Sequence, residues 1–295
     1  MKIAAGIRSK AAIATFAAVL FSGFAFVGCD KENSVAPNTS QNDVSATSDA
    51  AEVTASAVGE ENGGMVDQLG DALEGASTDN FQGLAKTTDG ETMDAVYDPV
   101  AGMWTITINR ERGDINGNYY AAIARVYHYQ FLNQAGDPQQ FWITNGDTAR
   151  TIKFDIVSGS GRHITPRLSQ QLNQLEGNFV VTQAHLRNLV INGTYARAAV
   201  DTVTTHRAVR TLDHSISLQI TDLTGPRGKR FDLSRKISGT ISGHVSAYAT
   251  FQSGSGYGER NIERDFTIVI GDGKANINIG GETFEGEVQT GEIVD

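Results

Sequence analysis

From about Met93 onward, apolar and polar residues of this chain alternate with a period of two. In Trp104–Ile108, the residues Trp104, Ile106 and Ile108 point to one side of an extended chain and the two threonines point to the other. The alternation recurs in Ile152/Phe154/Ile156, Ile216/Leu218/Ile220, Phe266/Ile268/Ile270 and Ala275/Ile277/Ile279. Because only one face of each segment is apolar, the pattern predicts half-buried antiparallel strands.

Turn signals separate these segments, and their spacing predicts about eight to twelve strands in one all-β domain over residues 91–295. The signals lie at Pro99–Gly102, Gly113–Gly117, Asn145–Asp147, Gly225–Pro226, Gly271–Gly273 and Gly280–Gly281. We expect an antiparallel β-sandwich or a strongly curved meander sheet. Curvature is indicated between Ile237 and Val245, where glycines at 239 and 243 alternate with apolar residues on one face.

One segment of this domain has a helical pattern. Leu168, Leu172 and Leu175 share one stripe after Pro166, which predicts a short helix over Leu168–Glu176 that caps one end of the β core. The apolar strand faces are then expected to meet at native packing density, without a large apolar pocket, so that binding takes place on the exterior. An open, curved sheet with a ligand cavity on its apolar face is the alternative.

The preceding segment, residues 29–90, is rich in Ser, Thr, Ala, Asn, Asp and Glu. Asp30–Asp98 contains 15 acidic and 2 basic residues, whereas residues 101–295 contain 19 of each. Such a composition buries too little apolar surface to offset the entropy of ordering, so we predict a disordered acidic tether over residues 29–90. The acidic charge also argues against a nucleic-acid partner.

The first residues have the three parts of a secretory signal peptide, predicted over residues 1–28. Lys2, Arg8 and Lys10 precede a charge-free apolar run from Ala11 to Val27, and the small residue Gly28 follows it. An uncleaved anchor helix is the alternative, although this run is shorter than the roughly 20 residues of a membrane span. Cys29, the single cysteine of the chain, comes next, so the fold has no disulfide framework.

Phe26-Val27-Gly28-Cys29 resembles the lipobox of bacterial lipoproteins, with Phe26 in place of the usual aliphatic residue. The resemblance implies cleavage before Cys29 and attachment of acyl chains such as palmitate to Cys29, which would anchor the protein to a membrane. Cys29-Asp30-Lys31-Glu32 is similar to the charged tetrads of surface-exported lipoproteins of the Bacteroidetes. In enterobacterial lipoproteins, Asp after the cysteine tends to mean inner-membrane retention. We expect the outer membrane, on its periplasmic or its surface-exposed side.

Sequence motifs for catalysis or metal binding are missing. The six histidines stand singly, without the spacing of metal ligands. The Ser-Gly runs at 158–161 and 253–256 lack the spacing of a nucleophile elbow. Asp114–Asn118 begins like a calcium loop, but Tyr119 and Arg125 stand where that loop needs glycine and glutamate. We therefore expect no catalytic residues, no metal and no cofactor.

Two groups of residues are candidate binding surfaces. The segment Gly225–Lys236 is basic and suits contact with acidic polysaccharide or phosphate, although such residues also protect a solvated hairpin end; its cations are Arg227, Lys229, Arg230, Arg235 and Lys236. Tyr127, Tyr129 and Phe131 share one strand face and would stack on sugars if exposed. We expect them in the core instead, because Ile123 lies on the same face.

The predicted function is a non-enzymatic binding or structural role for a lipid-anchored exported protein at the cell envelope or surface. An envelope polysaccharide or another envelope protein is the expected partner. A carrier or chaperone of an apolar ligand such as a lipid is one alternative, and an envelope enzyme without a recognisable motif is another.

Overall fold

The computed structural model describes residues 39–77, 90–206, 208–227, 233–254 and 256–294. Strands make up most of these residues, as the all-β prediction requires. The elements are α1 (Thr39–Val58), α2 (Met65–Ser77), β1 (Glu91–Asp98), β2 (Met103–Gly113), β3 (Tyr120–Leu132), β4 (Pro138–Gln139), β5 (Ile143–Thr144), β6 (Asp147–Thr148), β7 (Thr151–Ile164), β8 (Leu168–Thr182), β9 (Asn188–Thr204), β10 (Val209–Pro226), α3 (Leu233–Lys236), β11 (Ser238–Ser253), β12 (Gly256–Gly271), β13 (Lys274–Ile279), β14 (Glu282–Glu287) and β15 (Ile293–Val294).

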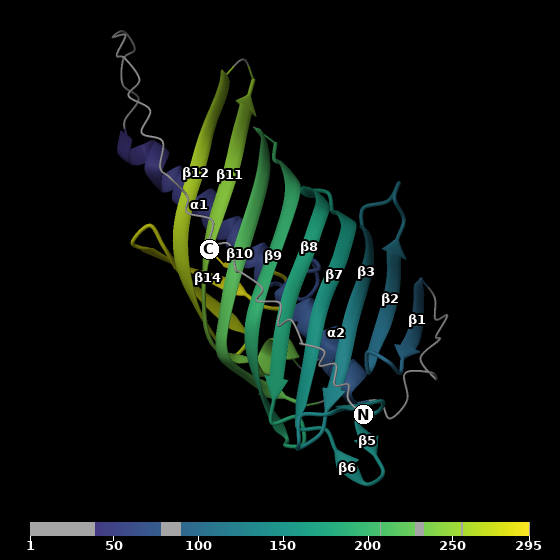
Figure 1. Cartoon of the computed structure of the whole chain (residues 1–295). Helices are drawn as coiled ribbons and strands as arrows, with labels where there is room; N and C mark the ends of the chain where they lie inside the picture. The colour runs from purple at the N-terminus through teal and green to yellow at the C-terminus, as the bar shows by residue number, and fades with distance from the viewer. Residues whose placement is uncertain (1–38, 78–89, 207, 228–232, 255, 295) are drawn as a thin grey trace, which may run out of the picture. The chain divides into compact units, whose positions relative to one another are not determined.

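One antiparallel sheet of 13 strands forms the body of the described chain (Figure 1). Its order is β1-β2-β3-β7-β8-β9-β10-β11-β12-β13-β14-β15, with β4 paired to β3, while β5 and β6 form a separate pair. Strands that follow each other in the chain are therefore neighbours, as in a meander. This confirms the curved-sheet alternative, because helices and not a second large sheet cover the apolar face. The sheet stays open, since β1 and β15 lie at its two ends.

Short glycine turns allow this meander at the positions that the sequence indicated. Asp272 and Gly273 join β12 to β13 with φ angles of 53° and 82°, and Gly280 and Gly281 join β13 to β14 with φ angles of 60° and 82°. Two consecutive residues with positive φ match the twist of the flanking strands, so these hairpins need only two-residue loops.

Glycine inside β11 also has the predicted structural role. Gly243 lies opposite Leu218 of β10 and Phe266 of β12. A Cβ atom at this position would lie 2.4 Å from the Phe266 ring and 2.3 Å from the Ser217 carbonyl oxygen. The absence of a side chain therefore lets β11 approach its neighbours and lets the Phe266 ring turn inward.

Helices α1 and α2 lie against one face of the sheet, here called the inner face; the opposite face is the outer face (Figure 1). Met65, Val66, Leu69 and Leu73 of α2 are buried, and α1 buries mostly small residues, among them Ala50, Ala51, Val53, Ala55 and Ala57. The strands contribute the apolar side chains that face them. The hydrophobic core is thus a layer between one sheet and two helices.

The helices correct the prediction of a disordered tether for residues 39–77. The composition of α1 gave no apolar stripe, but small side chains let the sheet approach its backbone closely. In addition, Asp49, Glu52, Asp67 and Asp71 pair with arginines of the inner face. These acidic residues are therefore part of the packed structure.

The predicted helix over Leu168–Glu176 is also wrong, because these residues belong to β8. The pairing of β8 with β9 shifts by one residue between Leu172 and Gln174. This bulge inserts an extra residue, so that Leu172 and Leu175 both point inward although they are three positions apart. A bulged strand thus reproduced the spacing of a helical stripe.

The aromatic residues of β3 lie in the core, as expected. Tyr127, Tyr129 and Phe131 are each 1% exposed, and the rings of Tyr127 and Phe154 lie 4.8 Å apart. Tyr127 and Tyr129 therefore cannot form a sugar-stacking platform on the surface, and this candidate binding surface is withdrawn.

Candidate functional site

The inner face of the sheet changes from apolar to charged along the length of the strands. Near one end, Trp104, Tyr129, Phe154 and Phe179 lie opposite each other on β2, β3, β7 and β8. Toward the other end the corresponding row reads Arg112, Ala121, His163, Gln170 and Asp201 on β2, β3, β7, β8 and β9. The candidate site lies at this charged end.

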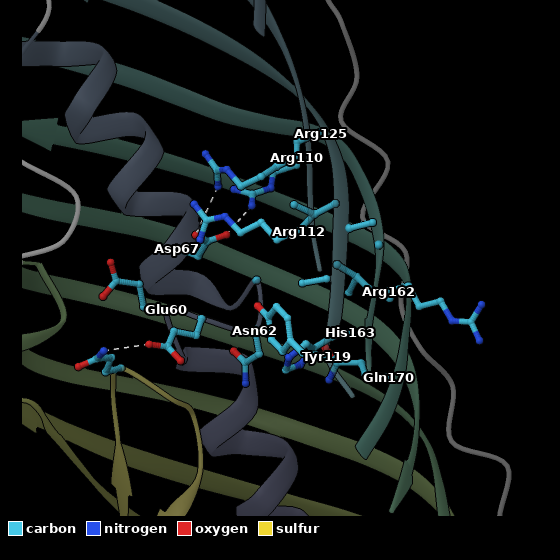
Figure 2. Close-up of a pocket in the computed structure, with 18 of the residues that line it drawn as sticks. Glu60, Asn62, Asp67, Arg110, Arg112, Tyr119, Arg125, Arg162, His163 and Gln170 are labelled. Atoms are coloured by element: carbon cyan, nitrogen blue, oxygen red, sulfur yellow. Dashed lines mark hydrogen bonds and ion pairs between the residues drawn. The ribbon is translucent and has the colours of Figure 1, made fainter. Parts of the chain in front are cut away.

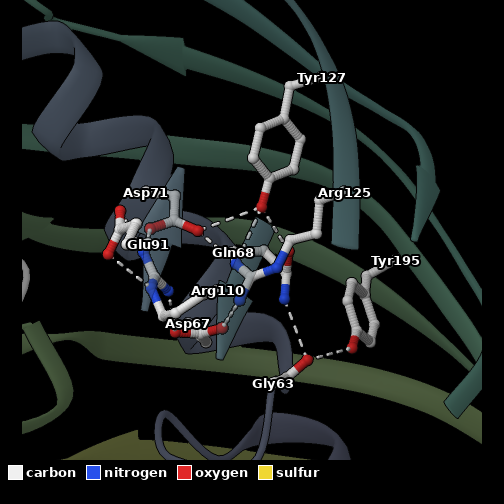
Figure 3. Close-up of polar contacts among 9 residues, drawn as sticks. All are labelled: Gly63, Asp67, Gln68, Asp71, Glu91, Arg110, Arg125, Tyr127 and Tyr195. Carbon is white, nitrogen blue, oxygen red and sulfur yellow. Dashed lines mark hydrogen bonds and ion pairs between the residues drawn. The ribbon is translucent and has the colours of Figure 1, made fainter. Parts of the chain in front are cut away.

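Arg125 of β3 is the centre of a buried ion-pair network with α2 (Figure 3). Its side chain is 1% exposed, and its Nη1 and Nη2 atoms pair with Asp71 and Asp67. Nη1 also donates to the Tyr127 hydroxyl at 2.9 Å, and that hydroxyl donates to Gln68 Oε1 at 2.7 Å. Burial raises the pKa of Tyr127, so this hydroxyl stays protonated. The network fixes α2 to the inner face.

Arg110 of β2 extends the network, and one of its donors makes no hydrogen bond to the described residues. Its Nε donates to Glu91 Oε2 at 2.9 Å, and its Nη2 donates to Glu91 Oε1 and to Asp71 Oδ1, each at 3.2 Å. The hydrogen bond from Arg110 lowers the pKa of Glu91, which stays ionised. Nη1 has no hydrogen-bond partner among the described residues and lies 3.8 Å from Asp67 Oδ1. Arg110 is only 9% exposed, and Nη1 belongs to a small set of buried polar atoms without hydrogen-bond partners among the described residues, which also includes Arg125 Nε and His163 Nδ1.

Helix α1 is held in the same way by a separate group of residues. Arg210 pairs with Asp49 and Glu52, and Arg260 pairs with Asp49. Buried Arg197 donates from Nη1 to the Ser56 carbonyl oxygen at 3.2 Å and from Nη2 to Ser56 Oγ at 3.0 Å. Both helices therefore carry carboxylates or hydroxyls that match guanidinium groups of the sheet.

A cavity of about 460 Å³ lies where the turn between α1 and α2 passes over the charged end of the sheet (Figure 2). Its volume falls in the range of small-molecule sites, roughly 300–1,000 Å³. Arginines, acidic residues, aromatic residues and a short apolar strip line it, among them Glu60, Glu61, Asp67, Arg110, Arg112, Tyr119, Ala121, Ile123, Arg125, His163, Gln170, Leu172 and Arg235.

The two ends of the cavity differ in their chemistry. Figure 2 shows Arg110, Arg112 and Arg125 extending toward Asp67 at one end, with Tyr119, His163 and Gln170 gathered at the other. Ala121, Ile123 and Leu172 provide the apolar strip. The arginines remain protonated at any physiological pH, so they can bind an anion but cannot act as general acids or bases.

His163 is the titratable group of the second end. Its ring meets that of Tyr119 edge to face, with centroids 5.7 Å apart, and its Nδ1 has no hydrogen-bond partner among the described residues. Burial lowers the pKa of His163, against the opposing effects of Asp201, Glu61 and Glu292. The imidazole is therefore neutral near pH 7 and offers one further polar atom beside the cavity.

The C-terminal segment holds the turn that closes the cavity. The amides of Glu60 and Glu61 donate to the carbonyl oxygens of Val288 and Gln289, each at 2.9 Å. Gln289 Nε2 also donates to Glu61 Oε1 at 2.9 Å. Residues from both ends of the described chain thus fix this wall of the cavity.

The basic segment 225–236 is only partly brought to this site. Arg235 lines the cavity, whereas the Arg227 guanidinium lies 4.1 Å from the centroid of the Trp142 ring, over its face. Lys236 ends α3 and is not among the lining residues. Lys229, Arg230 and the predicted lipidation site Cys29 lie outside the described residues.

Sequence reasoning missed Arg110, Arg125, Asp67 and Asp71. A signal was present in the alternation of the strands. Arg110 lies an even number of positions from the inward-pointing Trp104, Ile106 and Ile108, and Arg125 lies two positions from the inward-pointing Tyr127. A cation at a core position requires a buried anion as its partner. The excess of acidic residues before the sheet provided that partner.

Comparisons with known proteins add no relative: no protein-family model, no curated protein and no solved structure matches the chain. Within residues 39–77 and the described part of the sheet domain, no helix has the length and apolar character needed to cross a membrane. The same described residues contain no group of three or more His, Cys, Asp and Glu side chains arranged to hold a metal ion.

Proposed function

We propose that this protein is a lipid-anchored, non-enzymatic binding protein of the bacterial envelope and that the cavity under the α1–α2 turn is its ligand site. The observation that carries the proposal is a cavity of about 460 Å³ that is lined by Arg110, Arg112 and Arg235. Arg110 Nη1 makes no hydrogen bond to the described residues and has only the Asp67 carboxylate nearby, at 3.8 Å. Buried donors without partners are uncommon in native proteins, because a buried polar group that makes no hydrogen bond costs about 1–3 kcal/mol of stability. A bound ligand would satisfy this donor.

The anchoring part of the proposal depends on Cys29 and is tested separately. The chain in which Cys29 is replaced by alanine should lose its acyl chains and leave the membrane fraction, or keep its signal peptide and migrate as a longer form. Metabolic labelling with palmitate and separation of membrane and soluble fractions measure both outcomes. Unchanged labelling, mature size and membrane partition of Cys29→Ala would contradict the anchor.

A carrier of lipid is the second candidate, because the cavity lies inside the fold, between helices and a curved sheet. Its apolar strip of Ala121, Ile123 and Leu172 would contact an acyl chain. The two candidates differ in the ligand that would be found: a small molecule for the binding protein, and a two-chain lipid for the carrier.

Native mass spectrometry of the full-length Cys29→Ala chain, made in a lipid-rich bacterial host, tests cavity binding. We expect a bound small molecule at near-equal stoichiometry, and a bound phospholipid would favour the carrier. Ala121→Phe should fill the cavity and remove the ligand. Ala124→Phe is the matched control, because Ala124 is exposed on the outer face of the same strand. Equal ligand occupancy in both variants would contradict the assignment of the cavity as the site.

A further inference from the structure

The side chains around the cavity differ in whether their charge is already neutralised. Both terminal nitrogens of Arg125 are engaged by Asp67, Asp71 and Tyr127, while its Nε has no hydrogen-bond partner among the described residues. Arg110 uses two of its three nitrogens on Glu91 and Asp71. Arg112 and Arg235 line the cavity without an ion pair to any residue that the structure describes. The guanidinium groups of Arg112 and Arg235 therefore have donors available to a ligand, and Arg110 adds Nη1, which makes no hydrogen bond to the described residues and lies 3.8 Å from Asp67.

The acidic residues of the wall are less available than these arginines. Asp67 is paired with Arg125 and lies close to Arg110. Glu61 accepts a hydrogen bond from Gln289. Glu60 is the acidic lining residue without a side-chain hydrogen bond or ion pair to the described residues. Free donors therefore outnumber free carboxylates, which favours an anionic ligand over a cationic one.

The apolar strip gives the cavity a second requirement. Ala121 and Ile123 of β3 lie between Arg112 and Arg110 of β2 on one side and His163 and Gly161 of β7 on the other. Leu172 of β8, opposite Gly161, completes the apolar strip. A small inorganic anion would leave this strip and most of the volume of about 460 Å³ without contacts. A ligand that has an apolar part beside its acidic group would contact the apolar strip and fill the remaining volume.

From these observations we infer that the cavity binds an organic anion, with its acidic group at Arg110 and Arg112 and its apolar part along Ala121, Ile123 and Leu172. The inference rests on the proposed function and adds the ligand class to it. Phosphate monoesters and carboxylates with an aliphatic chain are the compounds with this chemistry. The guanidinium pair supplies charge-assisted hydrogen bonds to the acidic group, and burial of the chain supplies the apolar contribution.

Arg162 offers a matched control for Arg112. It also borders the cavity, but it precedes the inward-pointing His163 in β7, and alternate residues of a strand point to opposite faces. Figure 2 shows its side chain extending away from the cavity. Replacement of either arginine by glutamine removes one positive charge near the site, but only Arg112→Gln removes a donor that faces the ligand.

Isothermal titration of the full-length Cys29→Ala chain with octyl phosphate, octyl trimethylammonium, octyl glucoside and inorganic phosphate tests the inference. The three octyl compounds are used below their critical micelle concentrations. We expect octyl phosphate to bind about tenfold or more tightly than the other three, since one or two charge-assisted hydrogen bonds account for a factor of this size. Arg112→Gln should weaken octyl phosphate binding about tenfold, whereas Arg162→Gln should leave it unchanged.

The possible failures are distinguishable. If octyl glucoside or octyl trimethylammonium binds as tightly as octyl phosphate, and Ala121→Phe abolishes this binding, the cavity is a binding site but the ligand class is wrong. If inorganic phosphate binds equally well, the apolar requirement is wrong. If Ala121→Phe changes the affinity of no probe, the cavity is not the site, and the proposed function fails together with the inference.

Discussion

A chain that lacks residues 39–77 should not reach a folded state, although the deleted segment lies outside the sheet. Met65, Val66, Leu69 and Leu73 are buried in α2, and burial of such a side chain contributes about 1.5–3 kcal/mol, or roughly 6–12 kcal/mol for four. Since the whole free energy of unfolding of a domain is about 5–15 kcal/mol, this loss alone approaches the total. Near-ultraviolet circular dichroism and thermal unfolding measure the effect.

A chain that begins at Asn38 is the control for this deletion. It keeps both helices and every contact of the compact unit Asn38–Asp295, so its melting temperature should equal that of the mature protein within a few degrees. Limited proteolysis should likewise stop near residue 38. A cooperative unfolding transition at an unchanged temperature in the chain without residues 39–77 would show that the helices are dispensable and only adjoin the sheet.

Replacement of Arg125 by leucine should lower the free energy of unfolding by about 3–5 kcal/mol, the usual cost of removing one partner of a buried ion pair. The change leaves Asp67 and Asp71 next to each other, with their side chains only 4% exposed. The cost arises mainly from these two carboxylates, which keep only Arg110 as a shared counter-charge and gain no contact with water. Urea unfolding, followed by tryptophan fluorescence, measures the difference.

Two further variants separate the loss of the charge pair from a general loss of packing. Arg125→Leu combined with Asp67→Asn and Asp71→Asn removes the uncompensated charges, so it should recover most of the lost free energy of unfolding. Arg162→Leu makes the same change on the outer face of the neighbouring strand β7 and should alter stability by no more than about 0.5 kcal/mol. If Arg125→Leu were as mild as Arg162→Leu, the network would not hold α2.

The strands could be predicted because their signal is local. Trp104, Ile106 and Ile108 alternate within five residues, and the turns at Asp272–Gly273 and Gly280–Gly281 have residues that adopt positive φ. The bulge after Leu172 could not be found in this way, because it depends on how β8 pairs with β9. Period-two alternation identifies a strand only where its pairing is regular.

Helix α1 and the charged lining of the cavity escaped prediction because they depend on contacts between distant residues. Helix α1 is held by Arg210 and Arg260, whose partner Asp49 is 161 and 211 positions away. The cavity likewise combines Arg112 of β2, His163 of β7 and Arg235 of α3. Charge counts treated the acidic segment and the neutral sheet as separate parts. The acidic residues of the helices pair with arginines of the sheet only when the fold brings the two parts together.

The position of Thr39 at the start of α1 limits how far the folded part can stand from its membrane, given the proposed anchor at Cys29. The nine residues from Asp30 to Asn38 span at most about 30 Å when fully extended. A tether that continued to residue 90 would have allowed the domain to explore a far larger volume. If Cys29 is the anchor that we propose, this short tether would keep the folded part next to the bilayer, and its ligand would have to be present at or near the membrane surface.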